Sequence, residues 1–128
     1  MRFLCLGYYD AAKMDALPRP EIDAIMAQCR PHLDDLHATG QVLVDLGLEV
    51  ETRSVRRVDG VARVTQGRVI ESQALIGNAF VIEARDFEEA IAVASKHPST
   101  QVSAGEQFGW AVEIRPIHTY RAQTTAGR

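Results

Sequence analysis

The sequence predicts an α+β protein, and three observations lead to that fold class. The chain has 128 residues, which is the length of one domain. Apolar residues recur at a spacing of three and four in residues 20–40 and again in 85–98, which is the helical period. Short apolar runs before and after these two segments, beginning with residues 2–9, are typical of strands. The expected order is therefore strand, helix, strands, strand, helix, strand.

The first helix is expected to begin at Pro20 or Glu21, because proline suits a first helical turn, and to stop at Gly40. Pro31 lies inside it, so a kink or a break is expected near Gln28. The apolar stripe of this helix consists of Ile22, Ile25, Met26, Cys29, Leu33 and Leu36.

Residues 41–58 alternate between apolar and polar side chains and predict strands. Asp59-Gly60 is a strong turn pair, which predicts a hairpin with the residues that follow. Residues 74–84 predict a central strand, and apolar side chains occupy both of its alternating positions.

The second helix has a predicted start signal, since Asp86 can cap it and Glu89 completes a capping box three residues on. Residues 101–109 are expected to be a loop, and residues 110–117 the last strand. The predicted buried face of this helix consists of Phe87, Ala90, Ile91 and Ala94.

Two strand–helix units joined in this order predict a ferredoxin-like βαββαβ sheet with both helices on one face. An antiparallel sheet with one wet face should alternate cleanly, yet residues 74–84 are apolar on both sides. A second copy of the same sheet is the simplest cover for the other face, so we expect a homodimer packed sheet to sheet.

Five stretches of the chain follow one another in a recognisable order and spacing: "ATGQVLVDLGLE", "VRRVDG", "VTQGRVIESQALIG", "FVIEARDFEEAIAVASKHP" and "GWAVEIRPI". In this order and spacing the chain resembles a known family, the YCII-related or DGPF-domain proteins, from about residue 2 to 117. The resemblance implies a dimeric α+β barrel, in which two ferredoxin-like protomers pack sheet to sheet.

The sequence departs from this family in two places. The family motif Asp-Gly-Pro-Phe, which continues to Glu and Lys, keeps only Gly67 and Glu71 here. Relatives also carry a helix histidine paired with an aspartate near the end of the second helix. His32 resembles that histidine, but His97 stands where the aspartate is expected, so a complete His–Asp pair is not visible. The motif residues that are replaced are now Gln66, Arg68, Val69 and Gln73.

His32 is the candidate general base, because it flanks the apolar stripe of the first helix and imidazole has a suitable pKa. Asp35, three residues on, is the candidate group that orients its ring. The alternative is a boundary histidine beside solvated aspartates. A ligand pocket between the sheet and the first helix is predicted from Tyr9, His32, Glu71 and Trp110.

Each of these pocket residues also has a plainer structural interpretation. Tyr9 at a strand end suits packing, and Glu71 suits a surface pair with Arg68. Trp110, as the only tryptophan, suits the core or the dimer interface.

Composition narrows the function classes. The net charge of −3 with scattered basic residues argues against nucleic-acid binding, and no apolar run is long enough for a membrane span. Cys5 and Cys29 lie in apolar stretches without zinc spacing, so we expect free thiols, a cytoplasmic protein, no metal and no cofactor. Residues 1–118 are expected to form one domain, and residues 119–128 a polar tail.

Two functions remain open from the sequence. The first is the binding of a small organic molecule between the sheet and the first helix, with cofactor-free acid/base chemistry of an isomerase or lyase type. The second is a non-catalytic regulatory or interaction module that uses the dimer as a scaffold. The surroundings of His32 distinguish them, since a concave, partly apolar cavity with convergent polar groups supports the first, and a histidine on open surface supports the second.

Overall fold

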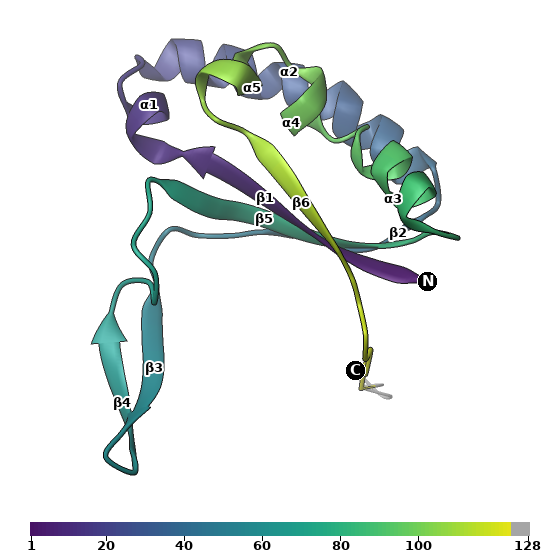
Figure 1. The fold of residues 1–128 in the computed structure, drawn as a ribbon. Helices are drawn as coiled ribbons and strands as arrows, with labels where there is room; N and C mark the ends of the chain where they lie inside the picture. Colours follow the sequence, from purple (N-terminus) through teal and green to yellow (C-terminus); the bar gives the residue numbers. More distant parts are fainter. Residues whose placement is uncertain (124–128) are drawn as a thin grey trace, which may run out of the picture.

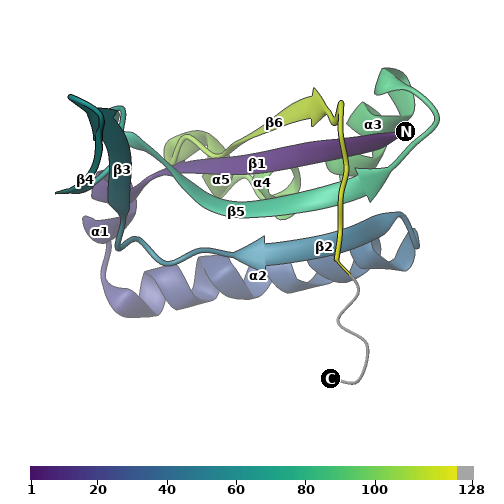
Figure 2. The same cartoon turned by 90° about the horizontal axis from the view of Figure 1, so that it is seen from below.

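A computed structural model describes residues 1–123. Its fold is α+β with a ferredoxin-like sheet. Four antiparallel strands lie in the order β2-β5-β1-β6 (Figures 1 and 2). The first strand of each βα unit thus lies in the middle of the sheet, as the βαββαβ topology requires. The predicted tail falls partly outside the described residues. The four strands are β1 (Arg2–Asp10), β2 (Val42–Gly47), β5 (Ala74–Glu83) and β6 (Ala111–Pro116).

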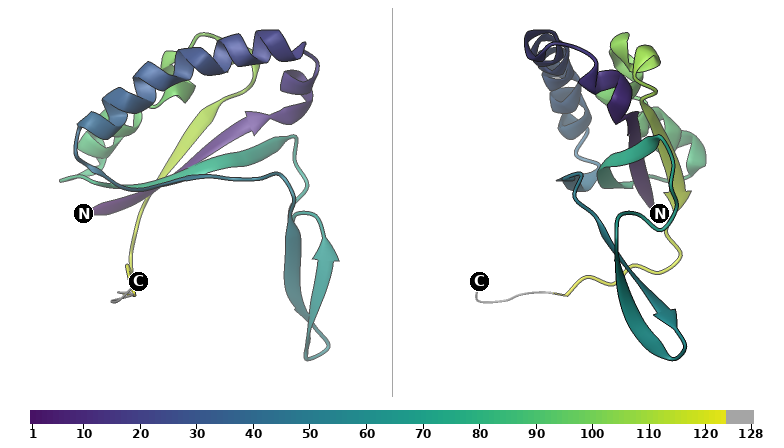
Figure 3. Two further views of the ribbon diagram at one scale, coloured as in Figure 1. Left: turned by 180° about the vertical axis from the view of Figure 1, so that it is seen from behind. Right: turned by 90° about the vertical axis from the view of Figure 1, so that its left-hand side faces the viewer.

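All the described helices cover the same face of this sheet, as predicted (Figures 1 and 3). Residues 101–109 are helical in part, so their assignment to a loop is wrong. Within residues 1–123, no helix is both long and apolar enough to cross a membrane. The helices are α1 (Ala11–Asp15), α2 (Arg19–Ala38), α3 (Phe87–Ala94), α4 (Pro98–Gln101) and α5 (Ala104–Gln107).

Helix α2 is one unbroken element that continues through Pro31, so the predicted break is wrong. A proline inside a helix removes one backbone hydrogen bond. Burial of Cys29 and Leu36 on either side holds the helix against the sheet. The helix ends as predicted, because Gly40 has a φ of 72°, a left-handed conformation that favours glycine.

Helix α3 begins as predicted, since the Asp86 side chain accepts from the backbone N–H of Glu89 at 2.9 Å. Its buried face is rotated from the predicted one. Phe87 and Ile91 are 45% and 50% exposed, so their placement in the core is wrong. Small residues form most of the contact surface and let the helix approach the sheet closely; the buried residues are Ala90, Val93 and Ala94.

Residues 53–66 form a separate two-stranded hairpin of β3 (Arg53–Val58) and β4 (Val61–Gln66). Figures 1 and 3 show it projecting from the sheet on the side away from the helices. The turn is as predicted, since Asp59 and Gly60 both have positive φ. The predicted run 41–58 is divided between β2 and β3, which belong to different sheets.

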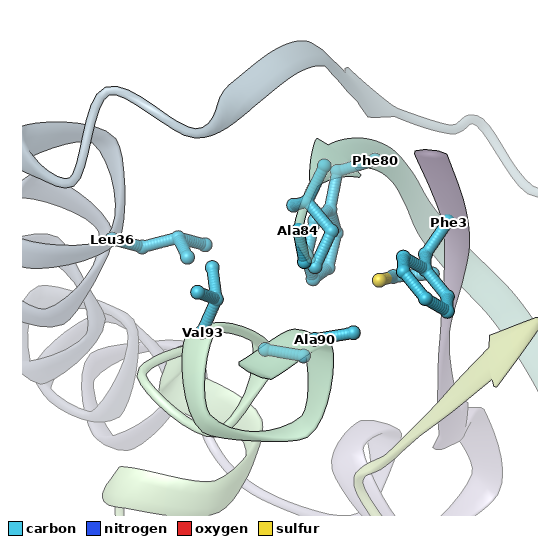
Figure 4. Packing of buried hydrophobic residues seen from close by; sticks show 9 residues of the cluster. Phe3, Leu36, Phe80, Ala84, Ala90 and Val93 are labelled. Carbon is cyan, nitrogen blue, oxygen red and sulfur yellow. The ribbon is translucent and has the colours of Figure 1, made fainter. Parts of the chain in front are cut away.

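The core lies between the sheet and the helices (Figure 4). Phe80 and Ile82 of β5 are fully buried there. The alternate residues of β5 point to the open face, where Val81 is half-buried. The other buried core residues are Phe3, Cys5, Leu36, Ala84, Ala90, Val93 and Ala94.

Candidate functional site

A cavity of about 540 Å³ lies between α2 and one end of the sheet. Its walls are largely apolar and aromatic. Helix α2 contributes Met26, Cys29 and Leu33, and Trp110, the residue before β6, also lines the cavity. Four polar residues converge on it from three different elements: Asp45, Asn78, His97 and Ser99.

The predicted pocket residues divide into two groups. Tyr9 and Trp110 line this cavity. Glu71 lines a different, more open depression beside Arg68, near the base of the hairpin. His32 is half-buried on α2 but does not line the cavity. The face of α2 that lines the cavity carries Cys29 and Leu33, and the His32 side chain points away from that face.

The predicted His32–Asp35 pair is not formed. Asp35 is exposed, and among the described residues His32 makes no side-chain hydrogen bond to it. The histidine that lines the cavity is His97, which follows the second helix. His97 therefore replaces His32 as the candidate histidine of the site. The sequence contained one indication of this site, because His97 stands where the family resemblance led us to expect an aspartate.

His97 occupies the residue before α4, where Pro98 opens the helix. Its Nδ1 accepts a hydrogen bond from the backbone N–H of Ser99 at 3.1 Å. A nitrogen that accepts carries a lone pair, so the proton of the neutral ring sits on Nε2. The two ring nitrogens therefore have different, fixed roles.

The Nε2 of His97 lies 2.7 Å from the side-chain amide of Asn78. An Nε2–H group needs an acceptor, so the amide oxygen belongs at this position and the amide NH₂ at the other; which atom is which is assigned from the hydrogen-bond network. The second amide atom lies directly over Gly7. A Cβ built on Gly7 would come within 1.6 Å of it, so glycine is required there.

The His97 ring is 6% exposed and stacks on Phe80, with ring centroids 5.2 Å apart and planes 5° from parallel. Burial lowers the pKa of the imidazole below its usual value, and the negative charge of Asp45 partly opposes this. His97 is therefore a neutral, rigidly held donor at pH 7.

Asp45 brings a second histidine to the site. Its Oδ2 lies 2.7 Å from Nε2 of His37, which stands on the last turn of α2. His37 is half exposed, whereas the Asp45 carboxylate is more sheltered and lines the cavity. The sequence held one signal for this pair, since Asp45 interrupts the apolar stretch "VLVDLG" on a strand position opposite buried Phe80.

The family assignment comes from comparison with family models. The model described as YCII-related domain matches residues 1–116. The chain belongs to the YCII-related domain family. A search of the curated proteins finds no match.

One solved structure similar to this YCII-related chain is 5-chloro-2-hydroxyhydroquinone dehydrochlorinase from Burkholderia phenoliruptrix AC1100, in complex with 2,5-dihydroxybenzoquinone. The two share 16% sequence identity, and the match covers 91% of this chain and 93% of the other with a TM-score of 0.48. This likeness is too distant to assign a ligand or an activity here.

Both cysteines are free and buried. Burial raises the pKa of the Cys5 thiol to about 12 and also raises that of Cys29, which lines the cavity. Neither thiol supplies much thiolate near neutral pH, so neither is a nucleophile candidate. In residues 1–123, no group of three or more His, Cys, Asp or Glu side chains is placed to hold a metal ion. The expected absence of a metal and a cofactor stays a prediction.

Proposed function

We propose that this chain binds a small organic molecule in the cavity between the sheet and α2, and that the cavity supports cofactor-free proton transfer. The observation that supports the proposal is the convergence of Asp45, Asn78 and His97 on a largely apolar space of about 540 Å³. Sites for small organic molecules have about this volume, with apolar walls and a few well-placed polar groups.

Asn78 is the donor in this proposal, and His97 positions it. The N–H of His97 holds the amide oxygen, which leaves the amide NH₂ at the cavity floor beside Gly7. An NH₂ group fixed in this way can donate to a carbonyl or enolate oxygen of a ligand. Such a donor stabilises negative charge that develops on that oxygen, because no reorganisation is needed.

Asp45 is the proposed base, in place of His32. Its carboxylate faces the cavity, and His37 holds one oxygen at 2.7 Å. The carboxylate would take a proton from the ligand while Asn78 stabilises the resulting anion. In an isomerisation the proton returns to another ligand atom, and in an elimination the electron pair leaves with a leaving group.

The homodimer, packed sheet to sheet, is also a proposal, as is a cytoplasmic location. The open face of the sheet carries exposed or half-buried apolar side chains on adjacent strands, and a contiguous apolar patch of this kind marks an interaction site. Two free cysteines support a reducing compartment. We also propose that residues 1–118 form the single folded domain. The apolar residues of the open face are Leu4, Leu6, Val44, Leu46, Ile76 and Val81.

The second candidate function is a non-catalytic regulatory or interaction module. The position of His32 favours it, because His32 does not line the cavity and so is not placed to act there as the base. A cavity that binds ligands without moving protons would support this alternative.

Trp110 provides the binding assay, because it is the only tryptophan and it lines the cavity. Small cyclic hydroxy-ketones and phenols would be screened for a change in its fluorescence. Compounds that bind would then be incubated with the protein in D₂O, and deuterium incorporation followed by NMR.

We expect Asp45→Asn to retain binding and to slow deuterium exchange by about 10²–10⁴-fold, the usual contribution of a general base. His32→Ala is the matched control and should leave the exchange rate unchanged. Binding with no exchange above the rate in buffer would favour the non-catalytic module. If no compound binds, or if His32→Ala alone abolishes exchange, the proposed site is wrong.

A further inference from the structure

The hairpin of residues 53–66, here called the arm, has an unusual apolar exposure. Val55 and Val64 face each other across its two strands and are 64% and 66% exposed. Val58 and Val61 form a second exposed cross-strand pair, on the opposite face of the hairpin. An isolated two-stranded hairpin is marginally stable at best in water. Its exposed valines therefore indicate a surface that is completed by something else.

The arm is also strongly basic in an acidic protein. It carries four arginines and one aspartate, a net charge of +3, whereas the remaining chain has ten basic and sixteen acidic residues, a net charge of −6. Arg56 lies directly opposite Arg63, and like charges in this position destabilise a hairpin. An acidic partner would relieve that repulsion, and the rest of a second copy, with its net charge of −6, has the complementary sign.

The direction of the arm fits a second copy. It leaves the end of β2 and returns into β5, on the side of the open sheet face (Figures 1 and 3). Two sheets packed face to face lie about 10 Å apart, whereas a strand of six residues spans about 20 Å. In a sheet-to-sheet dimer, an arm of this length would extend past the gap between the two sheets to the body of the partner protomer.

We propose that the arm is an intersubunit clasp: the face that carries the Val55–Val64 pair packs along the edge of the partner's sheet in a homodimer. The inference rests on the sheet-to-sheet dimer proposed above. It adds a specific element, outside the sheet face and outside the cavity, that holds the two copies together. It is independent of what the cavity binds.

The chain offers a clean way to remove the arm. The backbone N–H of Gly67 donates to the carbonyl of Thr52 at 2.9 Å, so the two ends of the arm are adjacent. Replacing residues 53–66 by two glycines should leave β2 and β5 in place. Circular dichroism and thermal melting would establish that this variant folds.

Dimer dissociation would be measured by analytical ultracentrifugation over a dilution series of the full chain and the armless variant. We expect a dimer for the full chain at micromolar concentration, with a Kd raised at least about tenfold in the armless variant. The double variant Val55→Thr with Val64→Thr keeps strand-forming residues but removes apolar contact, and should weaken the dimer in the same direction. Gly47 lies on the cavity side of the sheet, where an added Cβ meets no atom within 4 Å; Gly47→Ala is the control and should not weaken the dimer.

Hydrogen exchange tests the arm without any substitution. The amides of residues 53–66 should be protected in the dimer and should lose that protection on dilution below the Kd. If the full chain is a dimer and the armless and threonine variants dimerise equally well, the clasp is wrong while the sheet-to-sheet dimer stands. If the full chain is a monomer, or the arm amides exchange freely in the dimer, the clasp is also wrong; the cavity proposal is decided separately by the fluorescence and exchange assays.

Discussion

Acidification should destabilise this protein through His97. Its imidazole is buried and neutral in the folded chain, with a pKa below the usual value of about 6.5, whereas in the unfolded chain the ring is solvated and protonates near that value. As pH falls below about 6.5, the unfolded state binds the proton first. The stability that His97 contributes is therefore fully present above about pH 6.5 and is lost as pH falls toward the folded-state pKa.

The magnitude follows from the proton linkage. A single group that binds one more proton in the unfolded state changes the free energy of unfolding by at most about 1.4 kcal/mol per pH unit. The decrease stops once the folded-state pKa is passed. Asp45 limits the total, because its negative charge partly opposes the effect of burial on the His97 pKa.

The assay is urea unfolding at pH 7.5, 6.5, 5.5 and 5.0, with His97→Asn as the comparison. Asparagine is a good residue at a helix N-cap and can still accept from the Ser99 N–H, but it does not titrate. At pH 7.5 we expect the variant to be less stable by about 1–3 kcal/mol, since it loses the stack on Phe80 and the bond to Asn78. The difference between the two proteins should then shrink as pH falls. Parallel curves for the two proteins across this range would refute the reasoning.

Two further predictions concern the packing. Phe80→Ala should cost about 3–5 kcal/mol of unfolding free energy in urea denaturation, because Phe80 is fully buried under the helices; an unchanged transition would mean that the ring is not in the core. Gly7→Ala should lower the melting temperature and weaken ligand-induced quenching of Trp110, because the new Cβ displaces Asn78, whereas Gly47→Ala, whose added Cβ enters the open space of the cavity without meeting another atom, should leave the melting temperature unchanged. Equal melting curves for these two alanine variants would contradict the position of Asn78.

The sequence was a good guide to local structure wherever local chemistry decides it. Asp86 caps α3, Gly40 ends α2, and Asp59-Gly60 closes the hairpin, because each depends on backbone conformations that these residues favour by themselves. The apolar runs predicted the ferredoxin-like order of strands and helices and the covered face of the sheet.

The details of burial were less predictable. Phe87 and Ile91 fit the helical period as well as Ala90 and Ala94 do, but only one side of α3 can face the sheet. Small residues allow the closest approach, so the larger side chains remain partly exposed. Periodicity alone cannot rank apolar faces that differ by a small rotation of the helix.

The candidate site shows the same division. Tyr9 and Trp110 could be placed near the cavity from the sequence, because each lies at an end of a strand. The position of a strand end at the edge of the sheet does not depend on how the neighbouring side chains pack. His32 was misplaced, since a difference of one residue on α2 turns a side chain by about 100° and away from the cavity.

What the sequence by itself determined is the α+β class, the element order, and the predicted need for something to cover the second face of the sheet. Only the tertiary structure decided that His97, Asn78 and Asp45 meet. These residues are separated by 19 to 52 positions along the chain, and no spacing rule connects them. Strand register between β2 and β5 and the packing of α4 bring them together, and both depend on contacts formed throughout the core.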